Sequence, residues 1–219
     1  MATRQLLADL VARYQRDNEQ TLRTESIGGV EVARRIKAGE AVDIVVLAAD
    51  AIDQLIASGH LVAGSRVDLV HSGVAVAIRE GSKPIDITSE QAVKQAVLAA
   101  RTLSYSTGPS GVHLGRVFER WGIADAIAAK IVQAPPGVPV GSLVARGEVD
   151  LGFQQLSELM NLPGIAVLGP LPAPIQIMTT FSGALSSTST QGDAVRAFLA
   201  FAASPATLEL KRTNGMDPA

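Results

Sequence analysis

The sequence has no cysteine among its 219 residues, and this absence removes several kinds of site. Without thiols there is no disulfide framework, no thiolate nucleophile and no cysteine-ligated zinc or iron–sulfur site. Basic residues are not in excess either, because 19 Lys and Arg stand against 21 Asp and Glu, a net charge of −2. Nonspecific nucleic-acid binding normally requires a basic domain, so nucleic acid is not an expected partner.

Long apolar runs are also missing. Hydrophobic residues make up 47% of the chain, but no stretch reaches the ~20 apolar residues that a membrane span needs, so membrane insertion is not expected. The first residues, Met1 to Leu7, lack the charged head, apolar middle and small-residue cleavage site of a secretory signal. The residues alone therefore leave a cytoplasmic location open.

Three families of catalytic or cofactor motif are absent as well. The sequence has no P-loop, no Gly-x-Gly-x-x-Gly opening a βαβ unit and no Gly-x-Ser-x-Gly turn. Its three histidines, His60, His71 and His113, have no partner at metal-ligand spacing. We therefore expect no metal and no cofactor.

Helical and strand patterns alternate along the chain. An apolar run bounded by Asp43 and Asp50 is typical of a strand buried on both faces, as in a parallel sheet. Strands are predicted at 21–25, 44–49, 67–78, 103–106, 149–153, 164–169 and 175–182, and helices at 3–17, 30–36, 50–58, 93–98, 112–121, 124–131, 193–203 and 205–212. This alternation predicts an α/β fold of mostly parallel sheets flanked by helices.

Two of the predicted strands are long enough to run between two lobes. They cover residues 67–78 and 175–182, the second one introduced by a proline-rich stretch. We therefore expect a discontinuous lobe I, residues 1–77 and 181–219, and a lobe II formed by residues 78–180.

Glycine-rich turns between a strand and a helix are the first candidate binding elements. Main-chain amides at a helix start favour an anion, and glycine lets the anion approach closely. Candidate ligand-binding residues in three such turns are Ser26, Gly28, Gly29, Ser110, Gly111 and Gly137. Each turn alone is more often an ordinary connection. Gln154 and Gln155 follow a strand, where their amides can meet a ligand's oxygens or serve as simple turn hydrogen bonds.

Two residues are candidate catalytic groups. His113 lies one turn into the helix after the Gly108–Gly111 turn and can donate or accept a proton, although a helix-surface role is at least as common. Glu31 follows Gly29 closely and is either a carboxylate of the site or a favourable charge in the first turn of a helix.

The segment from Ala33 to Asp50 resembles a segment of the periplasmic molybdate-binding proteins, in which a helix ends at Ala-Gly and a strand carries Asp, three apolar residues and Leu-Ala-Ala-Asp. The resemblance continues in order through the Gly108–Gly111 turn, residues 145–152 and the Ser204-Pro205-Ala206 helix, so it covers nearly the whole chain. It implies a two-lobed type II solute-binding fold that closes on a small anion. It also implies a periplasmic location and an ABC permease as partner.

Carried over by position, the family's ligand contacts fall near Ala2, Gly29, Ser110, Gly137 or Val138, and Gln155. Gly29 and Ala2 replace expected hydroxyl residues and Gln155 replaces a tyrosine, so molybdate itself becomes doubtful. Residues 152–159 with 169–172 look more like the branch that includes aconitate isomerase, which acts on a tricarboxylate. The resemblance thus implies the substrate-binding component of an ABC-type transporter, with an isomerase and a cytoplasmic sensor as alternatives.

One departure from the family concerns the fold. The family begins with a strand before its first helix, whereas this sequence begins inside what should be the following loop. Neighbouring strands would then have unpaired backbone groups, at a cost of several kcal/mol, on the order of 1–3 kcal/mol for each buried group. We therefore expect a truncated or misassigned start, or another segment that fills the gap.

Overall fold

The computed structural model describes residues 1–135 and 137–219 and divides them into two compact units. Unit 1 comprises Met1–Ser72 and Thr179–Ala219, and unit 2 comprises Gly73–Met178. The chain passes between the units twice, within strand β2 (Val67–Arg79) and at the start of strand β6 (Met178–Leu185). Among the described residues, no helix is both long and apolar enough to span a bilayer.

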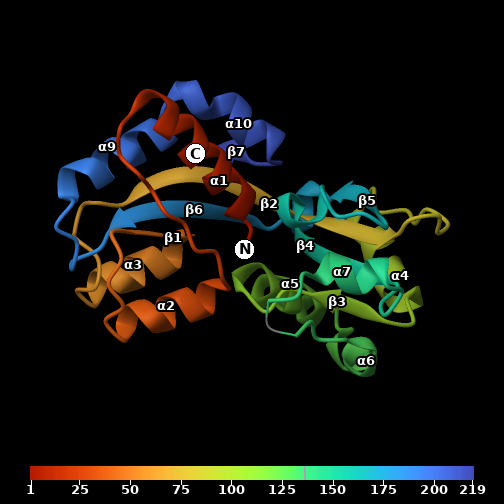
Figure 1. Ribbon diagram of the computed structural model, residues 1–219. Coiled ribbons are helices and arrows are strands. Elements are labelled where there is room, and N and C mark those ends of the chain that lie inside the picture. Colours follow the sequence, from red (N-terminus) through yellow and green to blue (C-terminus); the bar gives the residue numbers. More distant parts are fainter. Residues whose placement is uncertain (136) are drawn as a thin grey trace. The chain divides into compact units, whose positions relative to one another are not determined.

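Unit 1 is a sheet with helices on both faces, as Figure 1 shows. Its strands run in the order β1, β6, β2, with β7 also paired to β2. Helices α2 and α3 cover one face, and α1, α9 and α10 cover the other. The bounds are α1 Arg4–Asp17, α2 Gly29–Lys37, β1 Ile44–Ala48, α3 Ala49–Ala57, α9 Gly192–Ala203, the 3-10 helix η3 Pro205–Thr207, α10 Leu208–Thr213 and β7 Asp217–Pro218.

The two-residue period of β1 explains how both faces of unit 1 are filled. Val45 and Leu47 pack with Ile52 and Leu55 of α3 in one core cluster. Ile44 and Val46 face the second cluster, which contains apolar side chains of α1, α9 and the sheet: Leu6, Leu10, Tyr14, Leu69, Val70, Phe198 and Ala202. The apolar run that predicted this strand thus places side chains on both faces of the sheet, with Val45 and Leu47 buried and the alternate positions half-buried.

Unit 2 contains strands β2, β4 and β3 in that order, with β5 also paired to β2. Alternate residues of β2, namely Val74, Val76 and Ile78, enter the main core with helices α4, α5 and α6, while Ala75 and Ala77 face Leu159. The bounds are α4 Glu90–Ala99, β3 Leu103–Tyr105, α5 Pro109–Arg120, α6 Ala124–Ile127, the 3-10 helix η1 Ala128–Lys130, α7 Val140–Ala145, β4 Leu151–Gln155, α8 Leu156–Leu159, β5 Ile165–Pro170 and the 3-10 helix η2 Ala173–Ile175.

The strand pairing differs from the mostly parallel sheets expected. β3 and β4 are parallel, but β1 with β6, and β2 with β4, β5 and β7, are antiparallel. The long strand β2 runs from unit 1 into unit 2, so strands of either unit that return beside it run in the opposite direction. The fold is therefore mixed α/β.

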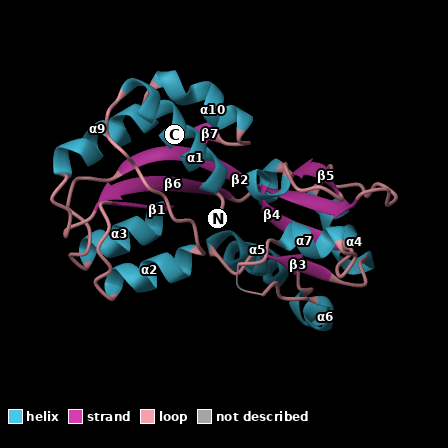
Figure 2. Cartoon of the chain, viewed as in Figure 1, coloured by secondary structure: helices cyan, strands magenta, loops and turns pink. Residues whose placement is uncertain are grey.

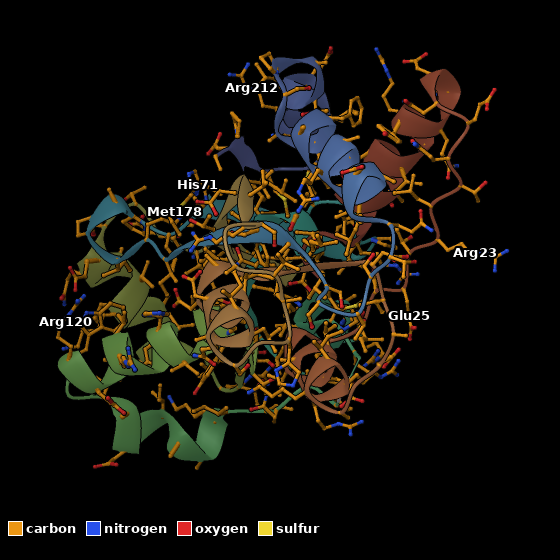
Figure 3. All side chains as sticks on the ribbon, turned by 90° about the vertical axis from the view of Figure 1, so that its left-hand side faces the viewer. Arg23, Glu25, His71, Arg120, Met178 and Arg212 are labelled. Carbon is orange, nitrogen blue, oxygen red and sulfur yellow. The ribbon has the colours of Figure 1, made fainter. Side chains whose placement is uncertain are left out.

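The strand predicted at 21–25 is wrong. Residues 18–28 form a loop between α1 and α2 (Figure 2), and Arg23 and Glu25 extend from it (Figure 3). A strand needs a hydrogen-bonded neighbour. In the part of the chain that the structure describes, no strand precedes β1, whose paired neighbour is β6.

Candidate functional site

The turn before α5 is built from short polar contacts. The Ser106 Oγ accepts a hydrogen bond from the Gly108 amide at 3.0 Å and lies 3.5 Å from the Ser110 Oγ. A Cβ atom on Gly111 would lie 1.5 Å from the Ser106 carbonyl oxygen, so the loop passes directly over the first turn of the helix. Gly111 is therefore required for packing, and Ser110 is buried beside Ser106.

The turn before α2, in unit 1, is more open. Ser26 is half-buried, whereas Gly28 and Gly29 are exposed. A Cβ on Gly28 would meet no heavy atom within 4 Å, and one on Gly29 would meet only Leu47 Cδ2, at 3.3 Å. The first hydrogen bond of α2 is donated by Val32 to the Gly28 carbonyl. The amides of Gly29, Val30 and Glu31 thus precede the helical ladder, where a helix accepts an anion.

The third turn lies before α7 in unit 2. Gly137 has φ +78°, a left-handed conformation that favours glycine. The half-buried Val138 donates its amide to the Pro135 carbonyl at 3.0 Å. Gly137 is therefore explained by the turn itself. A ligand contact at Gly137 or Val138 stays a prediction.

Gln154 and Gln155 end β4, and both are buried. The Gln154 Oε1 accepts from the Gly141 amide at 3.4 Å, and its Nε2 donates to Glu158 Oε2 at 2.8 Å. The Gln154 side chain therefore joins the start of α7 to α8. The sequence pattern indicated the side-chain amides of Gln154 and Gln155, but it did not indicate the Glu158 carboxylate, to which Gln154 donates.

Glu158 lies in α8, half-buried, one helical turn after Gln155. Burial raises the pKa of its carboxyl, whereas the positive charge of the N-terminal ammonium and the hydrogen bond from Gln154 oppose that shift. Beside it, the Ser157 Oγ is buried without a hydrogen-bond partner among the described residues. Sequence reasoning did not single out Ser106 or Glu158 as site residues.

Glu31 is held by two arginines. The Arg34 guanidinium donates to it at 2.6 and 2.7 Å, and Arg35 does so at 3.2 Å. These hydrogen bonds, that of Arg34 first, lower the pKa of the Glu31 carboxyl from 4.5 to about 2. A carboxylate this acidic is a weak base, so the contacts favour a surface ion pair for Glu31.

His113 lines a cavity of about 320 Å³ in unit 2, with Arg116 and Arg120 on the same face of α5. The segment Pro174–Ile177 forms the opposite wall. Arg120 lies at the outer surface of the helix (Figure 3) and donates to Glu90 at 3.0 Å. His113 therefore stands among cationic side chains, and its catalytic role stays a prediction.

The remaining candidate residue, Ala2, is only 8% exposed and packs in the core cluster of unit 1. Within unit 2, the structure brings Ser110 to Ser106 and Gln154 to Gly141 and Glu158. Ser26, Gly28 and Gly29 belong to unit 1. The described residues contain no group of three or more His, Asp or Glu side chains that could hold a metal ion.

Comparison with known proteins extends this description. The chain is 40% identical over 188 residues to an aconitate isomerase from Pseudomonas sp, an alignment that covers 85% of this chain and 71% of the relative. The periplasmic molybdate-binding protein of Azotobacter vinelandii has a similar structure, with a TM-score of 0.81 at 18% identity over 98% of this chain and 95% of that one.

A second solved structure has the same fold. It is the substrate-binding domain of a putative molybdenum ABC transporter from Clostridium difficile, with a TM-score of 0.75 at 18% identity over 100% of this chain and 95% of that one. The type II periplasmic-binding-protein fold expected from the sequence is thus confirmed. A family model described as bacterial extracellular solute-binding protein matches residues 1–217, and the chain belongs to that family.

Proposed function

We propose that this chain binds a small unsaturated polycarboxylate and interconverts its isomers, as an aconitate-isomerase-like enzyme. The observation that carries the proposal is the 40% identity to an aconitate isomerase over 188 residues. A fold alone would not support it, because one fold accommodates many functions. Membership of the extracellular solute-binding family supports a small-molecule ligand and a periplasmic location.

The turns before α2 and α5 are the proposed carboxylate-binding elements. The amides of Gly29, Val30 and Glu31 precede the ladder of α2, and the positive end of the helix dipole favours a negative charge there. Neither the φ of Gly28, −61°, nor its surroundings require glycine. An open, side-chain-free backbone at this position supports close approach by a ligand.

Isomerisation of such a substrate is a proton shift across three carbons. A base takes a proton from the carbon next to one carboxylate, and negative charge develops on the carboxylate oxygens. Hydrogen-bond donors aimed at those oxygens lower the barrier. The amides that bind the ground-state carboxylate can therefore also stabilise the intermediate, provided that a proton acceptor lies within hydrogen-bond distance of the reacting carbon.

The test combines binding with turnover. Thermal shift is measured with cis-aconitate, trans-aconitate, citrate, molybdate, tungstate and sulfate, and absorbance follows interconversion of the two aconitates. We expect a shift with the aconitates and conversion of one into the other. A shift with molybdate and tungstate alone would end the carboxylate proposal. Gly28→Val and Ser110→Val, one in each unit, then test whether one ligand uses both turns.

Transport is the second candidate function. The specific observation in its favour is that the Clostridium difficile structure is named as the substrate-binding domain of an ABC transporter. In that case the chain would bind its anion and deliver it to an ABC permease without changing it. A clear thermal shift with an aconitate, together with no conversion at micromolar protein concentration, would favour transport over isomerisation.

A further inference from the structure

The proposed isomerisation requires one group that removes a proton and returns it. Glu31 is poorly suited because two arginines hold its carboxylate and lower its pKa to about 2. His113 is exposed and shares its cavity with Arg116 and Arg120. The described residues that line this cavity include no carboxylate that could orient the imidazole as a base. Another carboxylate among the described residues is better placed to act as the base.

Glu158 differs in its partners from Glu90 and Glu148, two other glutamates of unit 2. Glu90 and Glu148 are exposed or nearly so, and each pairs with an arginine, at 3.0 Å from Arg120 and at 2.5 Å from Arg146. Glu158 forms no ion pair with any Lys, Arg or His side chain within the described ranges 1–135 and 137–219. Its side-chain partner is the neutral amide of Gln154, 2.8 Å from Oε2. The hydrogen bond to the Glu158 side chain thus comes from a neutral amide and not from a guanidinium.

The position of Glu158 in the fold also favours chemistry. It lies one turn beyond the carboxyl end of β4, and ligands of α/β sheets bind beyond strand ends. The strand is buried along its whole length, so Gln154 is a fixed support for the carboxylate. Gln154 is itself held by the Gly141 amide at 3.4 Å. A base that is anchored in this way can act with little loss of side-chain entropy.

A purely structural role would use different contacts. Glu158 is the third residue after the N-cap position Gln155, where a glutamate often bonds back to the N-cap amide in a capping box. Its recorded hydrogen bond goes instead to the side chain of Gln154. Burial raises the pKa of its carboxyl, whereas the exposed Glu148 has its pKa lowered by Arg146. Helix capping therefore does not explain why the carboxyl group of Glu158 is buried.

We propose that Glu158 is the proton-transfer group of the isomerisation, an inference that rests on the proposed function. The Glu158 carboxylate takes a proton from the saturated carbon between a carboxylate and the double bond. The electron pair of that C–H bond spreads over the neighbouring carboxylate and the alkene. The same carboxyl group then returns the proton to the far end of the three-carbon unit, and the double bond moves by one position. No electrons leave or enter, so no oxidant or reductant is needed.

The experiment compares Glu158→Gln, Glu158→Asp and Glu148→Gln with the parent chain. Conversion of cis- to trans-aconitate is followed by absorbance, exchange of substrate carbon-bound hydrogen with deuterated water by NMR, and binding by thermal shift. For Glu158→Gln we expect kcat to fall at least about 100-fold, as for loss of a general base, and hydrogen exchange to fall with it. The thermal shift with trans-aconitate should persist. Glu158→Asp should retain part of kcat, and Glu148→Gln should behave like the parent.

The outcomes separate this inference from the proposed function. If the parent chain neither converts nor exchanges aconitate, the proposed function fails and the inference fails with it. If the parent is active and Glu158→Gln keeps both kcat and exchange, only the role of Glu158 is overturned. If Glu158→Gln loses the thermal shift together with activity, Glu158 binds substrate or holds the fold, and its role as the proton-transfer group is likewise overturned.

Discussion

The Gly111 Cα hydrogen points at the carbonyl oxygen of Ser106, and a Cβ atom in that direction would lie 1.5 Å from the oxygen. Real Cβ atoms do not approach backbone so closely, so the 106–108 loop would have to move for any other residue to fit. Gly111→Ala should therefore destabilise unit 2 by about 1–3 kcal/mol or more, as overpacking does. Urea unfolding measures the loss directly.

Gly115, one turn later in α5, is the matched control. A Cβ there would meet no heavy atom within 4 Å. Gly115→Ala should be neutral or stabilising by up to about 1 kcal/mol because alanine is the better helix former. Equal stability of the two variants would show that the Ser106 loop yields easily, and the turn before α5 would then not be a rigid binding element.

Gly29→Ser tests what the turn before α2 selects. Its Cβ would lie 3.3 Å from Leu47 Cδ2, so Leu47 needs to move by only a few tenths of an ångström and the variant should fold. The new hydroxyl would add a donor for a compact oxyanion. We expect a larger thermal shift with molybdate than the parent chain shows, and a smaller one with trans-aconitate.

Gly28→Ser is the control for this change, because it adds the same hydroxyl where no heavy atom lies within 4 Å. If neither variant alters the ligand preference, the turn before α2 does not contact the ligand. The amide-based binding proposal for unit 1 would then have to be abandoned.

Local sequence patterns predicted helices and strands correctly where the apolar residues of a segment are the ones that become buried. The apolar runs around Val45 and Val76 are strands, and Ser89 caps α4 through a hydrogen bond from the Ala92 amide at 3.1 Å. The segment around Arg23 was predicted as a strand because its local pattern is similar to that of the true strands. A local pattern does not reveal whether a neighbouring strand is available for hydrogen bonding, and this segment is a loop.

The candidate site was harder to predict from the sequence, because the roles of its residues depend on tertiary contacts. Gly111 was predicted to bind a ligand, whereas the structure explains the glycine by the close passage of Ser106, a contact that no spacing rule contains. Glu158 was missed because its burial and its hydrogen bond from the Gln154 amide distinguish it from Glu148, and both are tertiary properties. Glu31 was included because its two arginines, one turn away, were not weighed as partners.

Glu31→Gln should remove a small stabilisation that the parent chain has near neutral pH and loses in acid. The depressed pKa means that the folded chain keeps the carboxylate ionised, so its contribution is present above the ordinary value of 4.5 and is lost as pH falls towards about 2. The loss at neutral pH should be small and should shrink further in high salt, because Glu31 and Arg34 are exposed. Activity should survive, and a loss as large as that of Glu158→Gln would restore Glu31 as a catalytic candidate.

Glu158→Gln should have the opposite effect on stability. Its raised pKa means that the folded chain favours the protonated carboxyl. The stability that this group contributes is therefore fully present below the ordinary glutamate pKa and is lost as pH rises through the folded value. Gln is neutral at every pH and keeps the shape of the side chain, so the variant should match the parent near pH 4 and exceed it near pH 7 in urea unfolding.

Glu148→Gln gives the control with reversed sign. Arg146 lowers the pKa of Glu148, so this carboxylate stabilises the fold slightly above its ordinary pKa and not below it. Removing it should cost a little near pH 7 and nothing near pH 3. If Glu158→Gln is more stable than the parent at pH 7 but inactive, the Glu158 carboxylate serves catalysis and not stability. If Glu158→Gln is less stable than the parent at pH 7, the carboxylate holds α8 in place, and proton transfer must be assigned elsewhere.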